Sequence, residues 1–226
     1  MMRRSQLLSA AEFSAMLRDA RILEQDERGI KVMRLASGDM LKVFRVRGRF
    51  SIARIYSYAR RFCSNAARLR RLGIPTVEVK QLFHLETPAE TAVLYTPLAG
   101  ETLRERLERS TLTADELYRL GSFVALLHRH GVHFRSLHLG NIVLCADGGM
   151  GLIDIADMRI YPWPLWCMTR CRNFNHLHRY PEQIRALGEA GWLRVEDSYF
   201  ANAGLSSACE RRIRDHLRKI SAFPAE

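Results

Sequence analysis

The stretch that decides the fold is Phe134-Arg135-Ser136-Leu137-His138-Leu139-Gly140-Asn141, and Asp154 follows Asn141 by thirteen residues in Leu152-Ile153-Asp154-Ile155. Between the two lie an apolar run and a Gly-rich turn, Asp147-Gly148-Gly149, which together predict a hairpin. This layout places an amide and a carboxylate at the ends of two neighbouring strands. Oxygen ligands of this kind suit Mg²⁺ on a nucleotide, so the sequence predicts a magnesium–nucleotide site here.

The pattern before this stretch is rich in strands, and the pattern around and after it is rich in helices. Hydrophobic periodicity predicts an N-terminal helix over 5–18, strands over 20–47 with a hairpin turn at 37–39, a helix over 51–72, and strands near 77–85 and 91–96. Further helices are predicted over 101–109, from the capping box Thr113–Glu116 to about 130, and over about 181–190 and 206–220. The sequence thus predicts an α+β fold with an N-terminal helix (1–19), a strand-rich lobe (20–98) and a helical lobe (99–226), with a hinge at 96–100.

The charge balance indicates an anionic partner. The chain carries a formal charge of +11, and only four of its 35 basic residues are lysine. From Val43 to Val77 there are nine arginines and no acid. This stretch predicts a surface for an anionic glycolipid, a membrane face or nucleic acid, and a solvated helix face is the alternative. No apolar run is long enough to cross a bilayer, so we expect a soluble cytosolic protein.

Three other features have both a functional and a structural interpretation. Cys167 and Cys171 could share one helix face, but no second pair has ligand spacing, so reduced thiols are favoured over a zinc site. Trp163, Trp166 and Trp192 predict an aromatic patch for a sugar or a membrane, with lobe packing as the alternative. The donor-rich segment 170–180 is interpreted either as a closing element that binds an anionic acceptor or as a solvated loop.

The order of elements and motifs resembles the protein-kinase-like fold, with two lobes. Leu41-Lys42-Val43 resembles the strand that carries the phosphate-binding lysine, and residues 134–141 resemble the catalytic loop H-R-D-L-x-x-x-N. Asp154 stands where the Asp of D-F-G would be. Over residues 20–185 the chain is similar to the bacterial lipopolysaccharide core kinases, which act on Kdo and heptose, and to the related toluene-tolerance proteins.

The resemblance implies ATP and Mg²⁺ as cofactors and a role for each matching residue. Lys42 would hold the α- and β-phosphates, and Asn141 and Asp154 would hold Mg²⁺. The segment Tyr95 to Leu98 would meet adenine, and His138 would face the γ-phosphate. Ser136 stands at the catalytic position, and Arg135 would supply compensating positive charge.

Departures from the kinase pattern leave two functions open. Ser136 replaces the catalytic Asp, and the nearest acidic candidate to take over its role is Asp157, three residues past Asp154. The helix that should offer a Glu to Lys42 holds no acid, although Ser64 or Asn65 could offer a hydrogen bond. The first function is an ATP-dependent kinase acting on a lipopolysaccharide core sugar or related glycolipid. The second is a pseudokinase that regulates or scaffolds envelope biogenesis. Specific nucleic-acid binding is the weakest interpretation, because no module that reads nucleic acid is present.

Overall fold

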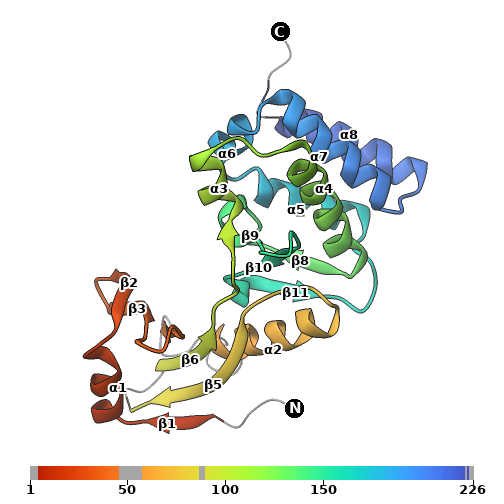
Figure 1. Ribbon diagram of the computed structural model, residues 1–226. Coiled ribbons are helices and arrows are strands. Elements are labelled where there is room, and N and C mark those ends of the chain that lie inside the picture. Colours follow the sequence, from red (N-terminus) through yellow and green to blue (C-terminus); the bar gives the residue numbers. More distant parts are fainter. Residues whose placement is uncertain (1–4, 46–57, 87–89, 222, 224–226) are drawn as a thin grey trace. The chain divides into compact units, whose positions relative to one another are not determined.

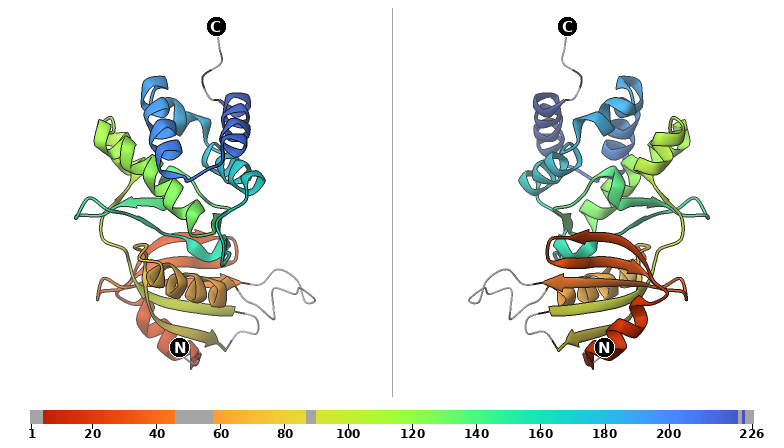
Figure 2. Two further views of the ribbon diagram at one scale, coloured as in Figure 1. Left: turned by 90° about the vertical axis from the view of Figure 1, so that its right-hand side faces the viewer. Right: turned by 90° about the vertical axis from the view of Figure 1, so that its left-hand side faces the viewer.

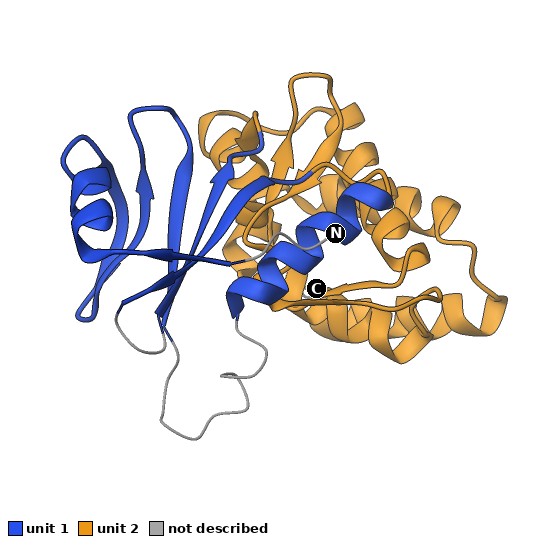
Figure 3. Cartoon of the chain, turned by 90° about the horizontal axis from the view of Figure 1, so that it is seen from below, with its two compact units in different colours: residues 1–71, 76–98 blue, residues 72–75, 99–226 orange. Residues whose placement is uncertain are grey.

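The computed structural model describes residues 5–45, 58–86, 90–221 and 223. The chain divides into two units, shown in different colours in Figure 3. Unit 1 comprises residues 1–71 and 76–98, and unit 2 comprises residues 72–75 and 99–226. Strands dominate the first unit and helices the second, so the expected α+β class is confirmed (Figure 1).

Unit 1 is built on a six-stranded sheet in the order β1-β5-β6-β4-β3-β2. Its strands are β1 (Gln6–Leu8), β2 (Arg21–Asp26), β3 (Gly29–Arg34), β4 (Met40–Arg45), β5 (Glu78–Leu85) and β6 (Glu90–Thr96). Neighbouring strands are antiparallel except β1, which runs parallel to β5 at the edge. The predicted hairpin turn at 37–39 connects β3 to β4, where Leu35 and Asp39 share a backbone hydrogen bond of 2.8 Å.

Helix α2 (Tyr58–Arg71) packs against β5 and β6 of this sheet (Figure 2). Its buried face follows helical spacing through Ala59, Phe62, Ala66 and Leu69, while its last turn is basic. The buried face also includes Asn65, the polar residue proposed as a neighbour for Lys42. The predicted helix began at residue 51, and its first seven positions lie outside the described residues.

The N-terminal segment differs from the prediction of one helix over 5–18. Residues Gln6–Leu8 form strand β1, and α1 (Ala10–Leu17) begins only after Ser9. Ser9 caps this helix in a capping box with Glu12, which fixes its first turn. Phe13, Met16 and Leu17 pack on the sheet core, so this segment belongs to unit 1 and is not a separate domain.

Unit 2 combines helices with three short ladders. Its helices are α3 (Leu103–Arg109), α4 (Ala114–Arg129), α5 (Cys167–Leu177), α6 (Pro181–Ala186), α7 (Glu189–Asn202) and α8 (Ser207–Ile220). Its strands are β7 (Glu101–Thr102), β8 (Val132–Phe134), β9 (Ile142–Leu144), β10 (Met150–Leu152) and β11 (Met158–Ile160). The capping box predicted at Thr113 and Glu116 is present at the start of α4.

Three helix predictions in unit 2 need correction. The helix expected over 101–109 begins at Leu103, because Glu101 and Thr102 pair with β9. The helix expected over 181–190 is divided at Gly188, whose φ of 73° ends α6 and precedes α7. Helix α5 was not predicted, because its buried face carries polar side chains, described below, that hide the apolar period. Among the described residues, no helix is both long and apolar enough to cross a membrane.

Candidate functional site in unit 2

Two short pairs of antiparallel strands flank the predicted site loop and fix its two ends. Strand β8 pairs with β11 through Phe134 and Met158, and β9 pairs with β10 through Ile142 and Leu152. Asn141 directly precedes β9, and Ile153 directly follows β10. The Ile153 N–H donates to the Asn141 carbonyl at 3.1 Å, which extends the ladder by one step. Asn141 and the residue before Asp154 are therefore hydrogen-bonded neighbours, although the two site residues lie thirteen positions apart in the chain.

The amide of Asn141 is held by the loop that precedes it. This side chain is 8% exposed, and its Nδ2 donates to the carbonyl of Ser136 at 2.9 Å. Among the described residues, no hydrogen bond reaches Asn141 Oδ1. The amide oxygen is therefore oriented by protein contacts on its nitrogen side and available to a ligand, as a metal-binding amide requires. Ser136 contributes to this arrangement through its main chain.

His138 lies beside this amide. Its Nδ1 accepts from the Gly140 N–H at 3.1 Å, and its Nε2 lies 3.1 Å from Asn141 Nδ2. A neutral imidazole has one acceptor nitrogen, so the ring accepts from only one of these two donors. Burial lowers the pKa of His138, and the charges of Arg104 and Arg179 lower it further, while Asp154 opposes the shift. The ring is therefore neutral at pH 7, and the Asp154 carboxylate is near enough to affect it.

Asp154 adopts a left-handed backbone conformation, with φ 52° and ψ 42°. Among the described residues it is the one non-glycine position with positive φ. Its side chain does not cap the 3₁₀ turn Ile155–Asp157 that follows. Aspartate tolerates this region better than most residues, and strain of this kind is concentrated at functional sites. The backbone is thus consistent with a carboxylate placed for a ligand.

Arg135 and Asp157 bind each other. The Arg135 Nη2 lies 2.9 Å from a carboxylate oxygen of Asp157, and the Arg135 N–H donates to the Asp157 carbonyl at 3.1 Å. The acid considered as a substitute for the missing catalytic carboxylate is therefore bound by a guanidinium. This pairing makes Asp157 a poor substitute for the missing catalytic carboxylate, and it uses the charge that Arg135 was expected to offer.

A cavity of about 430 Å³ opens on the other side of His138. It lies between α3 and α6, and its walls include Arg104, Glu108, Tyr180 and Glu182. The rings of His138 and Tyr180 meet edge to face, with centroids 5.0 Å apart. Of these wall residues, Tyr180 belongs to the segment 170–180 that the sequence analysis singled out. Arg104, Glu108 and Glu182 were not identified, because they come from two helices that are distant in the chain from the loop motif.

A buried polar network joins helices α4, α5 and α7 to the end of β8, where the site loop begins. Arg170 Nη1 donates to the hydroxyl of Tyr199 at 3.3 Å, and Asn173 Nδ2 donates to the carbonyl of Phe134 at 2.7 Å. Because Asn173 Oδ1 is an acceptor, the His128 Nε2–H donates to it at 3.2 Å, and His128 Nδ1 then accepts from the Tyr199 hydroxyl at 2.9 Å. Burial lowers the pKa of His128 to about 3, which keeps the ring neutral. The network ties α5 to the strand that leads into the site loop.

The same network corrects the expectation of a loop over 170–180. Residues 170–177 lie in α5, and Arg170 and Asn173 are buried. The expected aromatic patch is also divided. Trp192 is 3% exposed and packs on His178, whereas Trp163 and Trp166 are 52% and 75% exposed.

The remaining predicted site residues lie in unit 1. Lys42 is on β4 opposite Val93, and its ammonium lies 5.8 Å from the centroid of the Phe44 ring. Tyr95 is buried, and its ring packs on Phe62 of α2 at a centroid distance of 5.3 Å. Leu98 is the last residue of the unit and is half-buried. Unit 1 therefore holds these three residues, and unit 2 holds Arg135, Ser136, His138, Asn141 and Asp154.

The donors in unit 2 fit a magnesium–nucleotide site better than a closed metal centre. Within the part of the chain that the structure describes, no three His, Cys, Asp or Glu side chains form a metal-binding group. All five cysteines are free thiols, including the pair on α5. Mg²⁺ on a nucleotide takes one or two protein oxygens and fills its shell with phosphate and water, which an amide–carboxylate pair satisfies. In comparisons with known proteins, no family model and no curated protein matches the chain.

Proposed function

We propose that this chain is a protein-kinase-like phosphotransferase that binds Mg·ATP and phosphorylates a hydroxyl of a lipopolysaccharide core sugar or a related glycolipid. The observation that carries the proposal is the backbone hydrogen bond from Ile153, the residue before Asp154, to the Asn141 carbonyl in unit 2. Asn141 offers an amide oxygen without a described partner, and Asp154 occupies a strained left-handed backbone position. Asn141 is the last residue of the loop whose sequence resembles the kinase catalytic loop, and Asp154 follows it by thirteen residues.

The two ligands would hold Mg²⁺, and Lys42 would hold the α- and β-phosphates. When bound, Mg²⁺ neutralises charge on the phosphates as the γ-phosphoryl group moves. The chain's own part is to orient the ligand oxygens. The Asn141 amide is held by its hydrogen bond to the Ser136 carbonyl. The backbone next to Asp154 is held by the hydrogen bond from the Ile153 N–H to the Asn141 carbonyl.

The acceptor sugar would occupy the cavity beside His138. Its wall offers the aromatic ring of Tyr180 for a sugar face, and Arg104, Glu108 and Glu182 for hydroxyl groups. His138 is neutral, contacts Asn141 and lines the cavity, so we assign it the task of orienting the acceptor hydroxyl. Phosphoryl transfer has a loose transition state and depends on positioning more than on a strong base. The absence of a carboxylate at Ser136 is therefore compatible with slow transfer.

A pseudokinase is the second candidate, and one observation favours it. Asp157, the acid considered as a substitute for the missing catalytic carboxylate, is bound by Arg135. A protein that keeps the nucleotide site and lacks the base would bind Mg·ATP and act as a regulator or scaffold in envelope biogenesis.

We propose that the protein works in the cytoplasm, peripheral on the inner membrane. The formal charge of +11 favours contact with an anionic surface. Trp163 and Trp166 expose large apolar rings, and such rings favour the boundary between water and lipid.

The deciding experiment measures transfer of labelled phosphate from ATP to a dephosphorylated lipopolysaccharide core by the purified full chain. We expect transfer in the wild type, a loss of about a hundredfold or more in Asp154→Asn, and little change in Ser136→Ala. Asp197→Asn, an exposed carboxylate on α7, is the matched control and keeps full activity. Binding of Mg·ATP without transfer would select the pseudokinase, and absence of both would refute the two candidates.

A further inference from the structure

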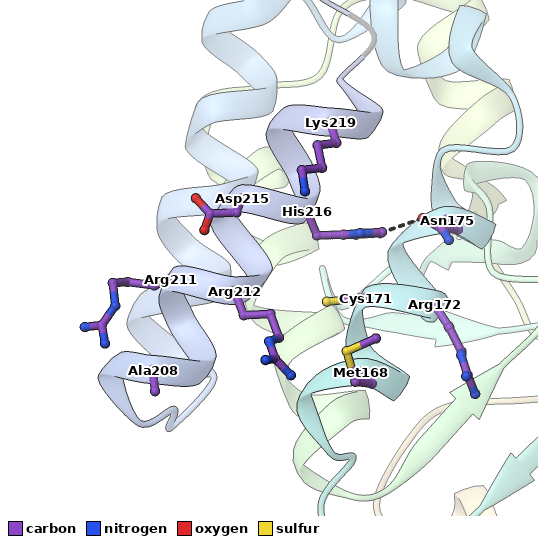
Figure 4. A pocket seen from close by; sticks show the side chains of 10 residues that line it. All are labelled: Met168, Cys171, Arg172, Asn175, Ala208, Arg211, Arg212, Asp215, His216 and Lys219. Carbon is purple, nitrogen blue, oxygen red and sulfur yellow. Dashed lines mark hydrogen bonds between the residues drawn. The ribbon is translucent and has the colours of Figure 1, made fainter.

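A second cavity in unit 2 lies between α5 and α8, away from the loop motif (Figure 4). Its volume is about 590 Å³. The residues on α5 are Met168, Cys171, Arg172 and Asn175, and those on α8 are Ala208, Arg211, Arg212, Asp215, His216 and Lys219. None of them has a part in the proposed phosphotransfer. We call this cavity the α5–α8 groove.

The α5–α8 groove carries a strong excess of positive charge. Four of its residues are cationic, namely Arg172, Arg211, Arg212 and Lys219, and one is acidic. The acid, Asp215, binds Arg218 at 2.9 Å and points to the far side of α8 (Figure 4). Among the described residues, no carboxylate forms an ion pair with any of the four groove cations. Within the described part of the chain, the positive charge of these four side chains is therefore not neutralised by a carboxylate.

Two of the four cations, Arg212 and Lys219, are directed toward the space between the helices, whereas Arg211 and Arg172 extend outward at its rim (Figure 4). His216 Nε2 donates to Asn175 Oδ1 at 2.7 Å, which links the two walls. Burial raises the pKa of the Cys171 thiol to about 11, so the floor of the groove is uncharged at pH 7. No groove side chain except Asp215 carries a negative charge that would repel an anion.

A buried cation next to the groove adds to this potential. Arg170 precedes Cys171 in α5 and is 3% exposed. Its acceptors are the carbonyls of Leu165 and Ala203 and the hydroxyl of Tyr199, so it is held by neutral groups in the described structure. Because water screens a buried charge poorly, this guanidinium makes the adjacent surface more positive than the groove cations alone would.

We propose that the α5–α8 groove is a binding site for a phosphate ester, carried either by a soluble small molecule or by a lipid headgroup. Arginine guanidinium groups match phosphate oxygens in a bidentate fork, and lysine adds a point charge. An open groove of about 590 Å³ has room for a phosphorylated headgroup and is too small to accommodate a nucleic-acid duplex. The site is independent of the proposed phosphotransfer, which uses other residues of unit 2.

The first arm of the test is calorimetric titration of the full chain with inorganic pyrophosphate in EDTA, which removes Mg²⁺ from the nucleotide site. The test variant is Arg212→Gln with Lys219→Gln, and the matched control is Arg129→Gln with Arg194→Gln. All four side chains are exposed, and the control pair lies outside the groove. We expect the test variant to weaken binding by about tenfold or more and the control to bind within about twofold of wild type.

The second arm uses vesicles of phosphatidylcholine with and without phosphatidic acid, in co-sedimentation. Binding that requires phosphatidic acid and is lost in the test variant assigns the groove to a lipid headgroup. Pyrophosphate binding alone assigns it to a soluble ester. The proposal is overturned if neither probe binds, or if the test variant and the control lose binding equally. It is also overturned if an oligonucleotide binds the groove and both phosphate probes fail.

Failure of this groove proposal and failure of the phosphotransferase proposal give different experimental results. An Asp154→Asn variant removes the magnesium ligand and leaves the groove unchanged. It should bind pyrophosphate in EDTA as the wild type does. A chain that fails to bind Mg·ATP and still binds pyrophosphate through Arg212 and Lys219 would refute the first proposal and support this one.

Discussion

At the scale of single residues, Asp154 is the position where sequence motif and backbone strain coincide. A left-handed backbone costs most residues about 1–2 kcal/mol, and aspartate and asparagine are the side chains that tolerate it best after glycine. Asp154→Asn therefore changes the chemistry of this position with little change in its backbone energy.

This property gives a testable contrast in stability. Asp154→Asn should change the free energy of unfolding by less than about 0.5 kcal/mol, whereas the β-branched Asp154→Val should lower it by about 1–2 kcal/mol. Denaturant unfolding of the two variants beside wild type measures the difference. Equal stability of Asn and Val at this position would contradict the assigned φ of 52°.

His128 gives a second residue-scale prediction, on pH dependence. Its pKa falls from 6.5 to about 3 on folding. The unfolded state therefore binds the proton more readily, and stability is complete above pH 6.5 and is lost as the pH falls towards 3. From pH 7 to about pH 5 this one group should remove about 2 kcal/mol of stability.

The measurement compares urea unfolding of wild type and His128→Gln across this pH range. The variant should be less stable at pH 7 but should lose less stability on acidification, because it has no group to protonate at this position. Other histidines with lowered pKa values, such as His178, act in both proteins and cancel in the comparison. Parallel loss of stability in the two proteins would exclude His128 as the source.

The sequence named candidate ligands in the site loop, which stay a prediction, but it did not predict the contacts within the loop. The motif identified Asn141 and Asp154 from residue type and spacing alone. It did not predict that Ser136 would hold Asn141 through a carbonyl oxygen, because main-chain contacts leave no trace in side-chain identity. Nor did it predict the Arg135–Asp157 pair, which joins the residue after β8 to the residue before β11, two strands that pair only in the folded chain.

At the scale of helices and strands, prediction succeeded where one face of an element is apolar. Strands β3, β4, β5 and β6 and helices α4 and α8 bury apolar residues, and their positions were predicted closely. Helix α5 was not predicted, because the polar residues Arg170 and Asn173 occupy its buried face. Their side chains are satisfied by hydrogen bonds to the backbone carbonyls of Ala203 and Phe134. The N-terminal strand β1 was missed because three residues are too few for a period.

The contact between α4 and α7 gives an element-scale prediction. A Cβ placed on Gly121 of α4 would lie 2.2 Å from the carbonyl oxygen of Val195 and 2.9 Å from the backbone nitrogen of Tyr199. Since these are backbone atoms of α7, the helices would have to separate. Gly121→Ala should therefore destabilise the protein by about 3 kcal/mol, as measured by denaturant unfolding.

Gly191→Ala on α7 is the matched control for this contact. Its nearest neighbour would be a side-chain methyl of Leu117 at 3.5 Å, which is ordinary contact. Alanine also favours the helix, so this variant should be neutral or more stable by about 0.5–1 kcal/mol. Similar destabilisation by both substitutions would contradict the close approach of α4 and α7 at Gly121.

At the scale of the whole molecule, each unit contains part of the proposed nucleotide site. Lys42, Tyr95 and Leu98 belong to unit 1, and Asn141 and Asp154 belong to unit 2. A sequence can predict such a division from the change between strand-rich and helix-rich segments. It cannot predict the α5–α8 groove, because that surface depends on two helices, one of them unpredicted, meeting in space.

The central claim is that Asn141 and Asp154 hold Mg²⁺ on ATP, and calorimetric titration of the full chain with ATP tests it most directly. We predict that wild type binds ATP with Mg²⁺ and loses this binding in EDTA, and that Asp154→Asn and Lys42→Ala each weaken it by about tenfold or more. At a hundredfold excess over Kd, Mg·ATP should add about 2.7 kcal/mol to the stability of wild type. The account would be contradicted if ATP failed to bind, or if it bound equally well without Mg²⁺ and to Asp154→Asn.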